Sequence, residues 1–231
     1  PLFTSCCPAW VKMAEHDFPE ILENISTCRS PQQMFGSVAK EVLPKELGIR
    51  REDLVVVSVM PCTAKKFEAG RDEFRVDGNP DVDVVLTTQE LARMIQDAGI
   101  QFPELPVDRL DQPFGTKTGA GVIFANSGGV TEAVIRYAAG HLGEDHPAIE
   151  EVRSEKNRRE LTAATPFGEI RMAVVHGLAR ARELVREIEA GESSVEFVEV
   201  MACPGGCIGG AGQPVTHSSK VRQRRTRVIR D

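Results

Sequence analysis

Two short apolar runs end directly in cysteine-containing segments, and this feature constrains the fold of the chain more than any other. Residues 54–59 (Leu-Val-Val-Val-Ser-Val) lead into Met60-Pro61-Cys62, and residues 195–201 lead into Cys203. Valine-rich runs bounded by proline and glycine are typical of β-strands. We therefore expect two buried strands, each with a cysteine just past its carboxyl end, which is where open α/β sheets bind their ligands.

Helical patterns alternate with strand patterns along the rest of the chain. The hydrophobic periodicity and the positions of Pro and Gly predict helices over residues 8–24, 31–42, 88–98, 130–141 and 177–190 and further strands over residues 81–87 and 168–176. Such alternation predicts an α/β fold. We expect the Pro-rich residues 101–117 to be irregular and the charged residues 143–159 to be an exposed connection or insert.

The length and composition exclude several classes of protein. With 231 residues, 41% of them hydrophobic, the chain is long enough for one large domain or two lobes. Its longest apolar run, of about eight residues, is too short to span a bilayer. The net charge of −6 argues against a nucleic-acid-binding protein. The basic tail from Lys220 to Arg230 has no interleaved aromatic residues, so we expect a solvated helix there rather than a nucleic-acid patch.

The start of the chain suggests that it is not a complete protein. The first residue is proline, and a Cys-Cys pair follows within the first seven residues. A functional motif seldom lies at a true amino terminus, so we expect this chain to be part of a longer protein. No signal-peptide pattern is visible, which favours a cytoplasmic location.

Five of the six cysteines lie in three motifs that place proline or glycine beside the thiols. The motifs are Thr4-Ser5-Cys6-Cys7-Pro8-Ala9-Trp10, Met60-Pro61-Cys62-Thr63-Ala64-Lys65-Lys66-Phe67-Glu68 and Met201-Ala202-Cys203-Pro204-Gly205-Gly206-Cys207-Ile208-Gly209-Gly210-Ala211-Gly212-Gln213-Pro214. Four thiolates can hold a cubane 4Fe–4S cluster. Proline bends the chain and removes a competing donor, and glycine lets backbone amides approach the sulfurs and tune the potential of the cluster. The motifs therefore favour iron–sulfur chemistry.

Two other interpretations of the cysteines stay open at this point. A structural zinc site usually takes its thiols from two short knuckles, whereas only Cys203 and Cys207 form a close pair here. Cys62 stands alone beside Lys65 and Lys66, and cationic neighbours suit an anionic cluster better than a zinc knuckle. Buried structural cysteines are the second alternative, which the Cys-Pro-Gly-Gly-Cys run disfavours. The cysteines are too widely spread for a small secreted disulfide scaffold.

The three motifs, in this order, resemble the three signature motifs of iron-only (diiron) hydrogenases. A fourth stretch, from Gly119 to Phe124 and from Gly128 to Ala133, is also similar to that family, so that the resemblance spans nearly the whole chain. It implies that residues 1–231 are the C-terminal portion of the catalytic domain of the large subunit, without its N-terminal part and accessory ferredoxin-like domains. It also implies an α/β fold of two lobes, each a small twisted sheet flanked by helices, with the cluster in the cleft between them.

The resemblance implies a particular cofactor and ligand set. In this family, a 4Fe–4S cubane is joined through one cysteine to a diiron unit with carbonyl, cyanide and bridging dithiolate ligands, and together they form the H-cluster. The implied cubane ligands are Cys7, Cys62, Cys203 and Cys207, of which Cys207 would be the bridging thiolate. Cys6 would be a free thiol that relays protons, a role that suits a thiol because its ordinary pKa is near ~8.5.

The resemblance also implies roles for residues around the cluster. Lys65 would donate hydrogen bonds to a cyanide ligand, with a surface lysine as the plain alternative. Residues at matching positions would wall the cluster pocket: Met60, Met201, Phe124, Pro31 and Gln32. For a methionine or phenylalanine, core packing is the plain alternative.

Three further residues receive roles of a different kind. Ser26 occupies the position of a proton-relay serine and also suits a turn. Glu68 is expected to organise structure rather than to relay protons. Cys28 matches no ligand, and we expect it to be a buried thiol.

The implied activity is the reversible oxidation of hydrogen to protons and electrons. Ferredoxin or a nicotinamide-linked protein would exchange the electrons, and maturation enzymes would build the H-cluster. Three alternatives stay open: a non-catalytic iron–sulfur assembly factor, a hydrogen sensor, and a zinc-binding interaction module. The doubled cysteine at Cys6 and the intact second motif with Lys65 count against the assembly factor.

Overall fold

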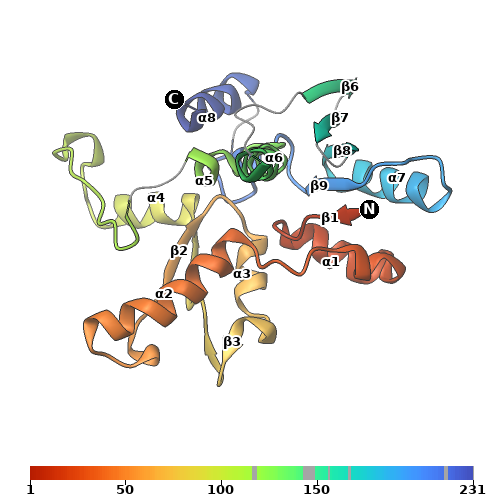
Figure 1. Cartoon of the computed structure of the whole chain (residues 1–231). Coiled ribbons are helices and arrows are strands. Elements are labelled where there is room, and N and C mark those ends of the chain that lie inside the picture. The colour runs from red at the N-terminus through yellow and green to blue at the C-terminus, as the bar shows by residue number, and fades with distance from the viewer. Residues whose placement is uncertain (116–118, 143–148, 156, 166–167, 216–217, 231) are drawn as a thin grey trace. The chain divides into compact units, whose positions relative to one another are not determined.

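The computed structural model describes residues 1–115, 119–142, 149–155, 157–165, 168–215 and 218–230 (Figure 1). Its contacts divide the chain into two compact units. Unit 1 contains Pro1–Cys28, Thr118–Gly209 and His217–Asp231, and unit 2 contains Arg29–Lys117 and Gly210–Thr216. Small sheets and helices make up both units, which confirms the predicted α/β class.

Unit 1 is built on a five-stranded mixed sheet in the order β1-β9-β8-β7-β6. The strands are β1 (Leu2–Phe3), β9 (Phe197–Met201), β8 (Gly168–His176), β7 (Arg158–Thr165) and β6 (Ile149–Glu155). β1, β9 and β8 run parallel, whereas β7 and β6 form an antiparallel pair at one edge. The parallel pairing brings the carboxyl ends of β1, β9 and β8 to the same edge of the sheet.

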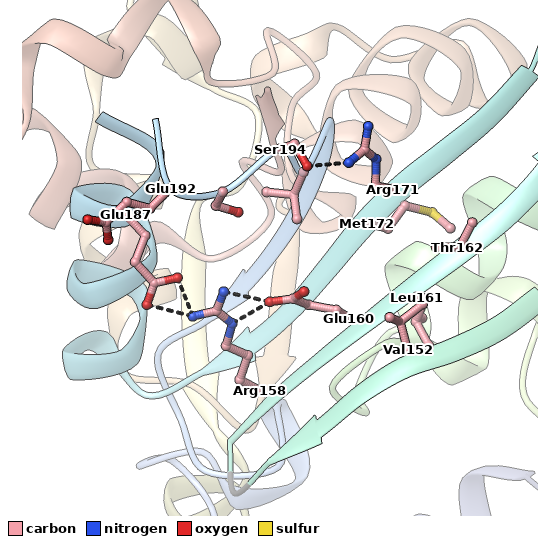
Figure 2. A pocket seen from close by; sticks show the side chains of 12 residues that line it. Val152, Arg158, Glu160, Leu161, Thr162, Arg171, Met172, Glu187, Glu192 and Ser194 are labelled. Atoms are coloured by element: carbon pink, nitrogen blue, oxygen red, sulfur yellow. Dashed lines mark hydrogen bonds and ion pairs between the residues drawn. The ribbon is translucent and has the colours of Figure 1, made fainter. Parts of the chain in front are cut away.

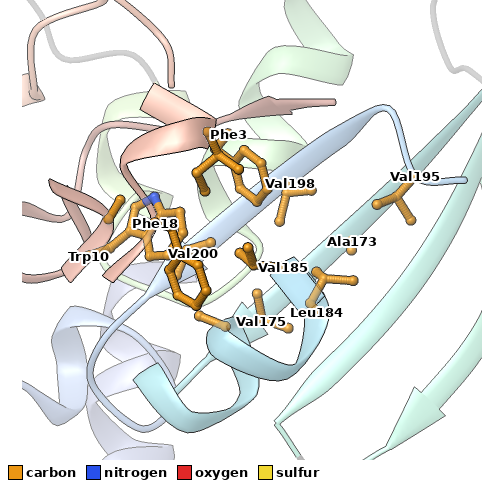
Figure 3. Close-up of a cluster of buried hydrophobic side chains, with 13 residues drawn as sticks. Phe3, Trp10, Phe18, Ala173, Val175, Leu184, Val185, Val195, Val198 and Val200 are labelled. Atoms are coloured by element: carbon orange, nitrogen blue, oxygen red, sulfur yellow. The ribbon is translucent and has the colours of Figure 1, made fainter. Parts of the chain in front are cut away.

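One face of this sheet packs against α1 (Pro8–Asp17) and α7 (Leu178–Glu189), and the main core lies between them (Figure 3). Its buried residues are Phe3, Trp10, Ala14, Phe18, Ile21, Ala173, Val175, Ala181, Leu184, Val185, Val195, Val198 and Val200. Successive side chains of a strand point to opposite faces. Met172 and Phe197 therefore face the other way, where they pack with Ile135 of α6 (Gly129–Leu142).

Unit 1 also contains α5 (Gly119–Ile123), a 3-10 turn at Cys207–Gly209 and α8 (Ser219–Arg230). The last of these confirms the predicted terminal helix. The helix predicted over residues 8–24 is interrupted, because α1 ends at Asp17 and a 3-10 helix follows at Pro19–Asn24. Proline disfavours the helical conformation of the residue before it, and Phe18 accordingly has φ −144°.

Residues 143–159, predicted as an exposed connection or insert, contain two strands where the structure describes them, so a connection without regular structure is wrong. Residues 149–155 form β6, and β7 begins at Arg158, with Asn157 at φ +73° in the turn between them. Charged residues crowd this edge hairpin and hid its strand pattern in the sequence. Residues 143–148 lie outside the described residues.

Unit 2 holds the remaining helices and two small sheets. The helices are α2 (Pro31–Leu47), α3 (Ala64–Ala69) and α4 (Thr88–Asp97), and three 3-10 turns lie at Arg51–Asp53, Asp72–Phe74 and Phe102–Glu104. β2 (Val57–Met60) pairs in parallel with β5 (Val84–Thr87), and β3 (Arg75–Val76) pairs in antiparallel fashion with β4 (Asn79–Pro80). The Pro-rich residues 101–115 contain no other helix or strand, as predicted.

α2 begins as predicted and ends later. The hydroxyl of Ser30 accepts a hydrogen bond from the amide of Gln33, and Pro31 occupies the first helical position. The helix continues past Pro44 to Leu47 and stops at Gly48, whose φ of +67° is a left-handed conformation that suits glycine.

The strand predicted at residues 54–59 is present only from Val57, and the expectation that it is buried is wrong. β2 begins at Val57, and the side chains of Val57 and Val59 are 51% and 46% exposed. The sheet has only two strands, so β2 has one hydrogen-bonded neighbour and one incompletely covered face.

Charged groups fill much of the interior of unit 2. The carboxylate of Asp81, which is fully buried, forms ion pairs with Arg29 and, at 2.6 Å, with Arg51. The buried ammonium of Lys40 lies 2.9 Å from the carboxylate of Asp83. Buried charges are tolerated when they are paired in this way. In the part of the chain that the structure describes, no helix combines the length and apolarity needed to cross a membrane.

The main core of unit 1 gives a test of the fold. We expect Leu184→Ala to lower the free energy of unfolding by about 2–5 kcal/mol, because the side chain is fully buried between α7 and the sheet and its removal leaves a cavity. The control is Leu47→Ala, at a residue that is 62% exposed at the end of α2. It should change the free energy of unfolding by less than about 1 kcal/mol. Chemical denaturation measures both, and equal losses would contradict this description of the core.

The first turn of α4 gives a test against pH. Glu90 accepts a hydrogen bond from the Thr87 amide at 2.8 Å and pairs with Lys66 at 2.9 Å, and these contacts lower its pKa to about 2 from an ordinary 4.5. A carboxyl whose pKa is lowered on folding stabilises the folded state above its ordinary pKa and loses this contribution as the pH falls. Wild type should therefore exceed Glu90→Gln in unfolding free energy at pH 7, and the difference should shrink between pH 4.5 and 2. A difference that stays constant across this range would contradict the assignment.

Candidate iron–sulfur site

The predicted cluster ligands are divided between the two units. Cys7, Cys203 and Cys207 belong to unit 1, and Cys62 belongs to unit 2. All six cysteines of the chain are present as thiols, and the predicted ligands and Cys6 are all half-buried.

The pairing of β1 with β9 brings motif one beside motif three. Phe3 pairs with Val198, so the residues that follow β1 and β9 leave the sheet at the same edge. The amide of Ala202 donates a hydrogen bond to Sγ of Cys7 at 3.4 Å. Backbone amides that donate to a cysteine sulfur tune the potential of a bound cluster. Cys7 thus has the surroundings of a metal ligand.

Cys6 has a different partner from its neighbour. Its Sγ lies 3.8 Å from the hydroxyl oxygen of Thr4, which is 5% exposed. The same oxygen accepts a hydrogen bond from the amide of Val200 at 3.3 Å, and this bond holds the hydroxyl of Thr4 beside β9. The thiol of Cys6 donates in this arrangement, whereas the sulfur of Cys7 accepts.

The loop from Cys203 to Cys207 is seated on the segment that precedes α6. The amide of Ser127 donates to the carbonyl of Gly205 at 3.1 Å, and the amide of Ile208 donates to the carbonyl of Ala125 at 3.0 Å. Gly206 has φ +92°, and a Cβ there would lie 2.5 Å from the nitrogen of Ser127. Only glycine fits this position, because the colliding atoms are backbone atoms.

Several polar side chains near this loop are buried without a hydrogen-bond partner among the residues that the structure describes. They are the side-chain amide of Asn126, the hydroxyl of Ser127 and Nδ1 of His176. Burial lowers the pKa of His176, and the positive charge of Arg159 lowers it further. Buried polar groups without partners in the protein leave hydrogen bonds that a bound group or an ordered water can supply. Thiols, close glycines and unpaired polar groups together fit an iron–sulfur cluster.

The thiols do not form a ready-made metal cage. Within the described ranges of the chain, no three His, Cys, Asp or Glu side chains are close enough together to hold a metal ion. The fit to a cluster therefore depends on the types of donor and on the geometry of the loops.

In unit 2, the end of motif three packs on motif two. The amide of Gly212 donates to the carbonyl of Pro61 at 3.1 Å, and the amide of Gln89 donates to the carbonyl of Gly212 at 2.9 Å. A Cβ on Gly212 would lie 2.7 Å from the nitrogen of Cys62, so a side chain is excluded here. A cavity of about 710 Å³ beside this contact is lined by residues of both motifs, including Thr63 and Ala211.

Lys65 is buried, so the surface-lysine alternative is wrong. Its ammonium lies 3.0 Å from each carboxylate oxygen of Glu68, and the two side chains are 9% and 5% exposed. Glu68 also accepts hydrogen bonds from Ser30 at 2.9 Å and from Gln32 at 3.2 Å. Ser58 on β2 donates to Gln32 at 2.8 Å. Glu68 is the shared acceptor of this network, which agrees with the structural role predicted for it.

The other predicted pocket residues lie at the ends of regular elements. Met60 ends β2 and is half-buried, Met201 ends β9 and is buried, and Phe124 follows α5 and is half-buried. Gln32 is buried in the network of Glu68, whereas Pro31 is exposed at the start of α2. Their roles at a cluster stay predictions.

Ser26 and Cys28 lie in one turn of unit 1. The hydroxyl of Ser26 accepts a hydrogen bond from the amide of Cys28 at 3.2 Å, which is the contact of a turn residue. Cys28 is exposed, so the prediction of a buried thiol is wrong. The turn carries Cys28 outward on the connection that leaves unit 1, whereas the apolar Ile25 before it packs on the core.

Glu199 is a buried residue of this region that the sequence analysis missed. It lies on β9, is fully buried, and accepts hydrogen bonds from the amide of Gly128 at 2.6 Å, the amide of Thr131 at 2.8 Å and the hydroxyl of Thr131 at 2.9 Å. Burial raises the pKa of Glu199, and the bonds from Thr131 and Gly128 act in the opposite direction. The signal in the sequence was an acidic residue inside an apolar strand.

A second pocket in unit 1 has a structural explanation (Figure 2). Its volume is about 170 Å³, and none of its lining residues belongs to a cysteine motif. Figure 2 shows the guanidinium of Arg158 between Glu160 and Glu187, with Nη1 2.8 Å from Glu187 and Nε 2.9 Å from Glu160. Since Arg158 is already paired inside the fold, this pocket is not a candidate for the cluster.

Comparison with known proteins identifies similar domains across nearly the whole chain. A family profile described as the C-terminal domain of the iron-only hydrogenase large subunit matches residues 1–211. The chain is 49% identical to the NADP-reducing hydrogenase subunit HndD of Solidesulfovibrio fructosivorans, over 99% of this chain and 40% of that protein. It is 42% identical to the periplasmic iron hydrogenase large subunit of Nitratidesulfovibrio vulgaris, over 93% of this chain and 52% of that protein.

Two further similarities bear on structure and function. The apo FeFe-hydrogenase HydA1 of Chlamydomonas reinhardtii has a TM-score of 0.84 and 35% identity, over 99% of this chain and 65% of that chain. The cytosolic iron–sulfur assembly component 3 of Mus musculus is 35% identical over 99% of this chain and 50% of that protein. The chain thus spans about half the length or less of the curated hydrogenases it matches.

The buried pair of Lys65 and Glu68 gives a test within unit 2. We expect Glu68→Gln to lower the free energy of unfolding by about 3 kcal/mol, because a buried ammonium loses the carboxylate that holds it. Asp97→Asn is the matched control, since Asp97 pairs with Arg93 across 3.6 Å on the surface, where the side chains are 72% and 81% exposed. It should cost less than about 1 kcal/mol in chemical denaturation. Equal losses of unfolding free energy in the two variants would show that the buried ion pair of Glu68 stabilises the fold no more than an exposed one.

Proposed function

Because the chain belongs to the family of C-terminal domains of iron-only hydrogenase large subunits, we propose that it forms part of a hydrogenase that catalyses the reversible oxidation of hydrogen to protons and electrons. In this proposal, the 4Fe–4S cubane of an H-cluster is held by Cys7, Cys62, Cys203 and Cys207. When bound, the H-cluster would supply the redox chemistry of hydrogen cleavage and formation. The residues of this chain would bind the cluster, offset its negative charge and transfer protons.

The different surroundings of Cys6 and Cys7 carry the proposal. A metal ligand must offer electron pairs on its sulfur, and the sulfur of Cys7 accepts a hydrogen bond from the amide of Ala202. A proton relay must keep a proton to give, and the thiol of Cys6 donates toward the buried hydroxyl of Thr4. Two adjacent cysteines with opposite hydrogen-bonding roles suit one ligand and one general acid or base.

Lys65 supports the same proposal from unit 2. An ammonium group that is 9% exposed is costly unless it serves a structure or a ligand, and Glu68 holds it in place three residues after Cys62. Its positive charge would offset the negative charge of the cluster, and an ammonium group can donate hydrogen bonds to an anionic ligand such as cyanide. Met60, Met201, Phe124, Pro31 and Gln32 would form the walls of the pocket, and Ser26 would extend the proton path.

A non-catalytic iron–sulfur protein is the second candidate. The similarity to cytosolic iron–sulfur assembly component 3, which extends over 99% of this chain, favours it. Both candidates would hold a cubane with the same cysteines. They differ in the diiron unit, which only the hydrogenase needs, and in the use of Cys6.

The partners follow from the chemistry of electron exchange. The name of the relative HndD describes an NADP-reducing enzyme, which supports a nicotinamide-linked protein as the electron partner, with ferredoxin as the other choice. Maturation enzymes would supply the H-cluster. The cytoplasmic location stays a prediction, since one relative is named as periplasmic.

The deciding experiment uses the full-length protein that contains this chain. The protein is matured anaerobically with its cluster-assembly enzymes, its infrared spectrum is recorded in the region of metal-bound carbonyl and cyanide, and hydrogen evolution is assayed with a reduced dye. We expect both the infrared bands and hydrogen. A cubane without the bands and without hydrogen would favour the assembly protein, and zinc without iron would reject both candidates.

Cys6→Ala tests the proton relay. We expect the iron content and the infrared bands to persist, because Cys6 is not a ligand, while hydrogen evolution falls by at least about a hundredfold. Cys28→Ala removes the exposed thiol of the same unit and should leave both unchanged. Loss of iron in Cys6→Ala would make Cys6 a ligand, and unchanged turnover would remove it from the mechanism.

A further inference from the structure

An acidic residue in an apolar strand needs a physical explanation. Val198 and Val200 of β9 enter the main core of unit 1, so the alternation of the strand sends Glu199 to the opposite face, the one that packs against α6. Its carboxylate is fully buried there. A buried carboxylate costs several kcal/mol unless hydrogen bonds satisfy it.

The first turn of α6 supplies those hydrogen bonds. The first amides of a helix have no partners within it, and they carry a partial positive charge. The residue at the N-cap position of α6 is Gly128, which has no side chain to accept hydrogen bonds from these amides. A side chain there would be strained at φ +90°, and its Cβ would lie 2.3 Å from the guanidinium of Arg159. Glu199 caps the helix from the neighbouring strand instead, through the amides of Gly128 and Thr131.

The capped end of α6 is continuous with the seat of the loop from Cys203 to Cys207. Gly128 follows directly on residues 125–127, whose backbone bonds to Gly205 and Ile208. Arg159 holds the same segment from β7, since its guanidinium donates to the carbonyl of Ser127 at 3.2 Å. Fixing Gly128 therefore fixes the surface on which the two cysteines of motif three are presented.

We propose that Glu199 is a positioning residue for the cluster, because it clamps the start of α6 and thereby holds residues 125–127 against the loop from Cys203 to Cys207. The inference rests on the proposed iron–sulfur function and adds a residue to it. Glu199 does not touch the ligands in this arrangement. It sets the positions of the two thiols and of the backbone amides around them, and these control how firmly a cubane is held and at what potential it is reduced.

Two substitutions remove parts of the clamp. Glu199→Gln keeps the size of the side chain. The glutamine amide has only one acceptor oxygen for the three donors of Gly128 and Thr131, and its NH₂ group would face some of these donors. Thr131→Val removes one of the three hydrogen bonds and leaves the carboxylate in place, whereas Thr131→Ser keeps the hydroxyl. Glu187→Gln is the matched control, since Glu187 pairs with buried Arg158 in the same unit and its pocket contains no cysteine motif.

The measurements separate positioning from general stability. In the full-length protein with a reconstituted cubane, we would measure iron release to a chelator and the midpoint potential by spin-resonance titration, at a temperature where circular dichroism shows every variant folded. We expect Glu199→Gln to release iron about 10- to 100-fold faster and to shift the potential, with a smaller effect in the same direction for Thr131→Val. Thr131→Ser and Glu187→Gln should behave as wild type.

Several results would overturn the inference. Wild-type iron release and potential in folded Glu199→Gln would make the residue merely structural. If Glu199→Gln does not fold, Thr131→Val decides, and wild-type behaviour of that variant rejects the clamp. A wild-type protein that takes up no cubane would remove both the iron–sulfur function and this inference. A cubane without a diiron unit would reject only the hydrogenase and leave the measurements on Glu199 valid.

Discussion

The parallel pairing of β1 with β9 is the constraint on which the rest of unit 1 depends. This short pairing joins residues almost two hundred positions apart and makes the Cys-Cys pair leave the sheet beside the strand that leads to Cys203. Cys7 then accepts a hydrogen bond from the amide of Ala202, whereas Cys6 donates to the hydroxyl of Thr4. Because the same strand carries Glu199 on its other face, the register of β9 determines both the surroundings of motif one and the support of motif three.

The two units are stabilised by different interactions. Unit 1 has a large apolar core between its sheet and two helices. Unit 2 keeps charged and amide groups inside, as shown by the partners of Asp81, Lys40 and Glu68, while valines of β2 are exposed. Such an interior depends on particular partners rather than on volume, so it tolerates fewer substitutions than an apolar core of the same size.

Local signals in the sequence predicted the elements that they control. Ser30 and Pro31 marked the start of α2, and Gly99 and Gly191 marked the ends of α4 and α7, because capping and left-handed conformations depend on one residue each. The strands of the hairpin near Asn157 were missed, since charge obscured their alternation. The exposure of Val57 and of Cys28 could not be predicted, because burial depends on which distant segments arrive to cover a residue.

In the candidate site, too, local patterns could be predicted from the sequence and contacts between distant segments could not. The cysteine motifs were recognised from residue type and spacing, whereas the roles of the single cysteines and of Lys65 were implied by the resemblance to the family to which the chain belongs. Glu199 was missed because its partners, Gly128 and Thr131, lie about seventy positions away, and no local pattern connects them. Its isolation in an apolar strand was a signal that a partner must exist, without showing which one.

The close glycines of the motifs have a consequence for genetics. A side chain at Gly206, Gly212 or Gly129 would collide with the backbone of another segment, at 2.5, 2.7 and 1.9 Å. A clash with a side chain can be relieved by a second substitution that makes the neighbour smaller, but the backbone is the same for every amino acid. Second-site suppressors in contact with these glycines should therefore be absent from a reversion screen, and only true revertants should restore the protein.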